Sequence, residues 1–127
     1  MALLSFAAFA ALTVEQPWRW GIQDCTTWAA DWCAARWGID PALSFRDRYA
    51  TEAEADALIA EAGSLIELVQ PHLRFLQQKD APDDGDVGVI AVLGRQTAAV
   101  RADCKWAFRT PAGLGFLDVP ALMVWGN

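Results

Sequence analysis

The pattern of apolar residues along this chain changes at Val87. Before Val87, apolar residues recur every three to four positions, and after it they form short runs separated by turn-forming residues. Helices followed by antiparallel strands predict an α+β fold in which N-terminal helices pack on a C-terminal antiparallel sheet. The chain has 127 residues, the usual size of one domain, so we expect residues 1–127 to form a single domain.

The most distinctive part of the helical half is the segment Glu15 to Pro41, which holds five of the seven tryptophans. Asp24 stands at an N-cap position, and Gly38 is a typical helix end. The residues between them carry an apolar pattern at helical spacing: Trp28, Ala29, Trp32, Cys33 and Trp37. We therefore expect a helix here, with Trp28 and Trp32 in the core.

The rest of the chain gives weaker signals. Thr51 with Glu54 and Ser64 with Glu67 match capping boxes and predict two more helices. Asp83, Asp84 and Asp86 are interpreted as turn formers, because no Glu follows at the spacing of a calcium loop. Strands are expected over residues 87–92, 97–102, 106–110 and 115–119.

The apolar stretch Ala2 to Leu12 has two interpretations. No Lys or Arg precedes it, which favours a first helix packed on the core over a signal peptide. A secreted domain with a signal peptide is the weakest alternative, and we expect no membrane-spanning segment.

Charge excludes one class of function. The formal net charge is -6, and no run of Lys or Arg forms a basic stripe. Because phosphate neutralisation requires such a stripe, we expect no nucleic-acid binding and no binding to an anionic membrane.

The three cysteines do not suggest a metal site. Cys25, Cys33 and Cys104 form no C-x-x-C pair, and the single histidine, His72, is distant in sequence, so we expect no metal and no cofactor. On a shared helix, Cys25 and Cys33 would lie about 12 Å apart. That is too far for a disulfide, so at least one free thiol is expected.

Cys25 is the candidate nucleophile. A cysteine in the first turn of a helix faces the positive end of the macrodipole, which lowers the thiol pKa. The alternative is a small buried apolar residue. A thiolate also needs a base, and His72 follows Pro71 in the helical half, where we expect no catalytic role for it.

Several segments together resemble a known family. They include Pro17 to Gly21 before Asp24-Cys25, Ala29 to Trp32, Gly38 to Pro41, Arg46 with Tyr49, and Gly85-Asp86-Val87. In this order they resemble phage and prophage tail proteins related to NlpC-type, papain-like cell-wall cysteine peptidases, over roughly residues 15–120.

The resemblance implies a papain-like fold with a nucleophilic cysteine at a helix start and a histidine on the strand after the Gly-Asp motif. Cys25 takes the nucleophile position, but Thr97, beside Gln96, stands at the approximate place of the histidine, and neither can act as an imidazole base. Many relatives in the tail subgroup carry a second histidine just before the Asp-Cys pair, where this chain has Gln23. Trp18, Trp20 and Gln23 are candidate substrate-binding residues; Trp18 and Trp20 could equally be core.

The resemblance thus implies a structural component of a phage tail tip or baseplate with a degenerate peptidase-like fold. Its partners would be tail hub and tail-tip proteins. It would be located at the tail tip of the virion, which is assembled in the host cytoplasm. The alternative is an active cysteine peptidase that binds peptidoglycan and cleaves its stem peptides during DNA entry.

Overall fold

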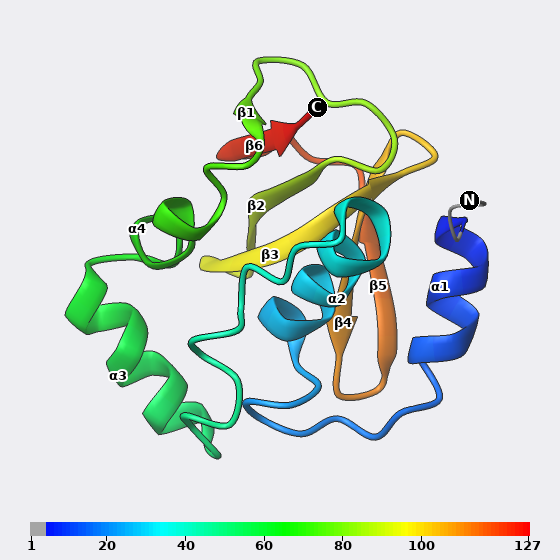
Figure 1. The fold of residues 1–127 in the computed structure, drawn as a ribbon. Helices are drawn as coiled ribbons and strands as arrows, with labels where there is room; N and C mark the ends of the chain where they lie inside the picture. Colours follow the sequence, from blue (N-terminus) through cyan, green and yellow to red (C-terminus); the bar gives the residue numbers. More distant parts are fainter. Residues whose placement is uncertain (1–4) are drawn as a thin grey trace.

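The computed structural model describes residues 5–127 and has an α+β fold (Figure 1). Its six strands form one antiparallel sheet in the order β1-β6-β2-β3-β4-β5. The helices are α1 (Phe6–Thr13), α2 (Cys25–Trp37), α3 (Glu52–Ala62), α4 (Leu65–Val69) and the 3₁₀ turn η1 (Gln70–His72). The strands are β1 (Gln77–Gln78), β2 (Val87–Val92), β3 (Arg95–Ala102), β4 (Lys105–Thr110), β5 (Gly113–Leu117) and β6 (Met123–Gly126).

Helix α2 begins and ends where the sequence predicts. The Asp24 carboxylate accepts a hydrogen bond from the Thr27 backbone N–H at 2.9 Å, and the Thr27 hydroxyl accepts one from the Asp24 N–H at 2.8 Å. This reciprocal capping box satisfies two N–H groups that a helix start leaves free. Gly38 ends the helix with a φ of 77°, a conformation that costs glycine little. Cys25 therefore lies in the first turn, as expected.

The main core lies between α2 and the sheet. In Figure 1 the sheet stands behind α2. Trp28 and Trp32 are buried, which confirms their expected core positions. The rings of Phe6 and Phe9 on α1 pack against both tryptophans at centroid distances of 5.3 to 6.0 Å. Helix α1 thus covers one side of α2; residues 2–4 of the expected first helix lie outside the described residues.

The sheet is also buried on its second face. A separate cluster consists of Ile90, Ala99, Trp106, Phe108 and Val124. Val119 and Ala121, in the connection between β5 and β6, pack against this cluster. Because both faces are buried, the strands are apolar in continuous stretches instead of alternating, as Val87–Ile90 shows.

Four features were not expected from the sequence. Strand β5 covers Gly113–Leu117 instead of residues 115–119. Strands β1 and β6 are short, and β6 pairs with both β1 and β2. Strand β3 begins at Arg95, two residues before the expected start, because the hairpin at Leu93-Gly94 is tight. Asp86 is more than a turn former: the residue is 2% exposed, and its carboxylate lies 2.7 Å from the Lys79 Nζ.

Candidate functional site

Cys25 is the first residue of α2 and is half-buried. The turn that leads to it is held by the neighbouring Asp24, whose second carboxylate oxygen accepts hydrogen bonds from the Gly21 N–H at 2.8 Å and the Tyr49 hydroxyl at 2.6 Å. Asp24 is 1% exposed. Its carboxylate is thus fully used in fixing the backbone around Cys25.

The Cys25 cavity, as we call it, is a small space of about 30 Å³ beside this residue. Its wall comes from five parts of the chain: the approach to α2, the first turn of α2, the loop after it, helices α3 and α4, and the start of β3. The lining residues are Trp20, Asp24, Cys25, Thr26, Phe45, Tyr49, Ala55, Leu58, Ile59, Leu65, Leu68, Arg95 and Gln96.

Of the two residues expected near the place of the histidine, Gln96 alone lines the Cys25 cavity. Side chains alternate between the faces of a strand, so Gln96 shares a face with Ala98 and Val100, which pack on α2. Thr97 points to the opposite face, as does Ala99. The Gln96 side-chain oxygen accepts a hydrogen bond from the Ile66 N–H at 3.2 Å, which fixes its amide in the cavity wall.

The single histidine lies outside the Cys25 cavity. His72 is exposed on η1, and its ring packs edge-on against Phe45 at a centroid distance of 4.7 Å. Within residues 5–127, the cavity therefore contains no imidazole.

The Cys25 thiol differs from the expectation for a helix N-terminus. Burial, and then the negative charge of Asp24, raise the pKa of Cys25 above its ordinary value. A hydrogen bond with Thr26 and the positive charge of Arg95 oppose this rise without cancelling it. The expected lowering of the pKa was wrong, because loss of solvent and a neighbouring carboxylate outweigh the helix dipole.

The three candidate substrate-binding residues lie in different surroundings. The rings of Trp18 and Trp20 are half-buried and meet edge-on at 5.1 Å, and Trp20 alone lines the Cys25 cavity. Trp18 lies beside the Arg109 guanidinium, 6.0 Å from the ring centroid. Gln23 is 2% exposed, and its amide donates a hydrogen bond to the Thr13 carbonyl at 3.2 Å. Substrate binding by these residues stays a prediction.

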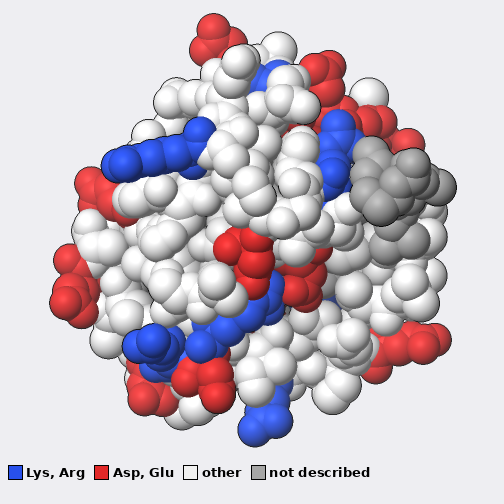
Figure 2. Space-filling view, viewed as in Figure 1, with Lys and Arg blue, Asp and Glu red and all other residues white. Residues whose placement is uncertain are grey.

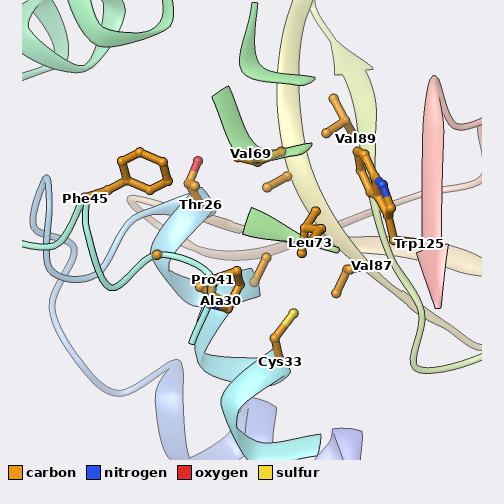
Figure 3. Close-up of a pocket in the computed structure, with 14 residues that line it drawn as sticks. Thr26, Ala30, Cys33, Pro41, Phe45, Val69, Leu73, Val87, Val89 and Trp125 are labelled. Atoms are coloured by element: carbon orange, nitrogen blue, oxygen red, sulfur yellow. The ribbon is translucent and has the colours of Figure 1, made fainter. Parts of the chain in front are cut away.

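A second, almost wholly apolar cavity of about 40 Å³ lies between α2 and the sheet (Figure 3). The Cys33 sulfur lies at its edge, with Val87 and Trp125 on the sheet side. Thr26 and Phe45 line both cavities. These two side chains thus separate the apolar space from the Cys25 cavity.

Sequence reasoning missed part of the wall of the Cys25 cavity. Leu58 and Ile59 of α3 and Leu65 of α4 look like ordinary apolar positions of amphipathic helices. Arg95 stands in a hairpin, where an exposed charge is usual. No local pattern marks these residues, because α3 and α4 reach Cys25 only through the tertiary fold.

Metal and disulfide chemistry find no support in the part of the chain that the structure describes. All three cysteines are free, and no group of three His, Cys, Asp or Glu side chains is arranged to hold a metal ion. Between residues 5 and 127, no helix has the length and apolar character needed to cross a bilayer.

Comparison with known proteins gives one finding. Residues 4–126 match the model of a family described as a domain of unknown function, DUF6950. No curated protein and no solved structure matches the chain.

Proposed function

Because the chain belongs to the DUF6950 family, whose function is unknown, we propose a function from the geometry of the Cys25 cavity together with the resemblance noted above. The protein is a structural component of a phage tail tip or baseplate. It is built on a papain-like, NlpC-like fold whose peptidase activity is lost.

One observation carries the loss of activity. Cys25 and Gln96 line the same cavity, and Gln96 stands near the place where the resemblance implies a histidine. A glutamine amide neither accepts the thiol proton nor delivers one to a leaving amine near neutral pH. Gln96 therefore cannot perform the proton transfers that peptide cleavage requires at this place.

The state of the thiol supports the same conclusion. A raised pKa keeps Cys25 protonated at neutral pH, and the thiolate is the nucleophilic form. General acid–base help contributes about 10²- to 10⁴-fold to such reactions. A site without an imidazole and with a protonated thiol should therefore be very slow on peptide bonds.

The partners follow from the resemblance, and the surface is compatible with them. Figure 2 shows acidic and basic side chains side by side on one face, with broad uncharged areas between them. A surface of this kind suits contacts with other proteins better than contacts with a phosphate backbone. The proposed partners are tail hub and tail-tip proteins, and the proposed location is the virion tail tip.

The test separates the structural component from an active peptidase. Purified wild-type protein and Cys25→Ala are incubated with peptidoglycan, and released stem peptides are measured by mass spectrometry. We expect equal background from both proteins, and Cys25→Ala should also leave particle assembly and the presence of the protein on purified virions unchanged. Cys104→Ala, which changes an exposed thiol, is the control.

Two results would contradict the proposal. Release of stem peptides by wild-type protein but not by Cys25→Ala would establish an active peptidase. A protein that immunolabelling finds in lysates and never on assembled particles would not be a virion component.

A further inference from the structure

Helix α3 forms one wall of the Cys25 cavity but is weakly held by the rest of the fold. Its residues Ala55, Leu58 and Ile59 line the cavity. Of the 11 residues of α3, only Ala55 is buried. A helix with so little buried surface has a low free energy of local opening.

The two ends of this segment are fixed more firmly than its middle. Before α3, Tyr49 is buried, and its hydroxyl donates a hydrogen bond to the Asp24 carboxylate. After α3, Leu65 is 2% exposed and belongs to the main core. Gly63 lies between α3 and α4 with a φ of 112°, and such element-terminal residues commonly absorb hinge motion.

Apart from the apolar contacts of Ala55 and Ile59, the helix is attached to β3 through the ion pairs of one arginine. The Arg95 guanidinium at the start of β3 pairs with Glu52 at 3.1 Å and with Asp56 at 2.6 Å. Glu52 and Asp56 are both on α3, and Arg95 also lines the Cys25 cavity. All three side chains are exposed, so salt should weaken both ion pairs.

We propose that α3 is a lid on the Cys25 cavity, latched to β3 by the ion pairs of Arg95 with Glu52 and Asp56. Opening of the lid controls access to the Cys25 thiol. The biological use of this control rests on the proposed function, in which the cavity is the remnant of a peptidase site. Movement of the lid itself does not depend on whether the site is active.

The test measures how fast Cys25 is alkylated by iodoacetamide. Cys104→Ser is the starting protein, so that the exposed hairpin thiol does not consume the reagent. The double variant Glu52→Gln/Asp56→Asn breaks the latch from the α3 side and leaves the positive charge of Arg95 beside Cys25. Glu61→Gln changes an exposed carboxylate on the same helix and is the matched control.

Cys33 provides an internal reference in the same molecule. It is 1% exposed and lines the second cavity, which no residue of α3 lines, so its alkylation reports opening of the main core and not of the lid. Mass spectrometry of the cleaved protein measures both thiols in one experiment. Opening of the lid raises the alkylation rate of Cys25 alone, whereas loss of global stability raises both rates.

We expect the double variant to raise the alkylation rate of Cys25 by about two- to thirtyfold, the range for loss of two exposed ion pairs. Cys33 should stay protected, and Glu61→Gln should behave like the starting protein. Added NaCl should accelerate Cys25 alkylation in the starting protein but not in the double variant.

An unchanged Cys25 rate in the double variant would overturn the lid, and so would equal acceleration of Cys25 and Cys33. Peptidoglycan digestion would overturn the proposed loss of activity but leave the alkylation result untouched, so the two failures are distinguishable.

Discussion

At the scale of single residues, Asp24 and Gln96 determine what the site can do. The Asp24 carboxylate has a structural role: it accepts hydrogen bonds from the backbone N–H groups of Gly21 and Thr27 and from the Tyr49 hydroxyl. Gln96 lines the same cavity as Cys25, and its amide cannot act as a base near neutral pH. Asp24 thus fixes the position of the Cys25 thiol, whereas Gln96 supplies no group that can accept its proton.

Replacing Gln96 tests whether the missing imidazole is what limits the thiol. Gln96→His should accelerate alkylation of Cys25 at pH 7 by at least about tenfold, because an imidazole in the cavity can take up the thiol proton. Gln96→Ala removes the acceptor for the Ile66 N–H without adding a base and is the control. If both variants react equally, access and not proton transfer limits the thiol.

Asp24→Ala should destabilise the protein by about 2–4 kcal/mol. The loss combines a helix cap with buried donors that would lack an acceptor. Thr51→Ala removes the exposed N-cap of α3 and should cost only about 1 kcal/mol. Urea denaturation of the two variants measures both values, and similar losses would mean that the burial of Asp24 adds nothing.

At the scale of elements, the close approach of β2 and β6 depends on Gly88. A Cβ atom at Gly88 would lie 2.7 Å from the Met123 carbonyl oxygen and 2.7 Å from the Trp106 ring. Trp106 fills the second face of the sheet and is fully buried. The glycine thus allows the indole to lie directly on the strand.

Gly88→Ala should therefore cost about 1–3 kcal/mol, the range for overpacking in a core. Gly94 is the comparison, because a Cβ there meets nothing within 4 Å and only its φ of 79° is unfavourable for alanine. Gly94→Ala should cost about 1 kcal/mol. Thermal unfolding of both variants distinguishes steric crowding from backbone strain, and a larger loss for Gly94→Ala would contradict this reading of the sheet.

At the scale of the whole molecule, burial of weak acids makes the fold sensitive to alkaline pH. Burial raises the pKa of Cys33 from 9.0 to about 12. Burial and the Asp24 carboxylate raise the pKa of Tyr49, and Cys25 shifts in the same direction. The unfolded chain releases these protons at lower pH than the folded protein does.

Stability should therefore be constant with respect to these groups below pH 9 and should fall as pH rises above it. The folded state then holds more protons than the unfolded state, so each pH unit costs up to about 1.4 kcal/mol per buried group. Urea midpoints at pH 8, 9 and 10 measure the fall, and Cys33→Ala should reduce its slope. Equal midpoints at pH 8 and pH 10 would contradict the prediction.

Sequence alone determined the local features. Asp24, the 3.6-residue pattern and Gly38 define α2, because caps and amphipathic spacing act within a few residues. The α+β class follows from local patterns in the same way. Strand β6 escaped prediction because its four residues gain their stability from β1 and β2, which are distant in sequence.

Only the tertiary structure decided the properties of the site. Register placed Gln96 in the Cys25 cavity and Thr97 on the other face, since a shift of one residue reverses a strand's side chains. Burial turned the expected lowering of the Cys25 pKa into a rise. Helix α3 lines the cavity, and its Asp56 pairs with Arg95, which lies 39 residues further along the chain. Desolvation, register and long-range ion pairs depend on the folded arrangement, which no local sequence pattern contains.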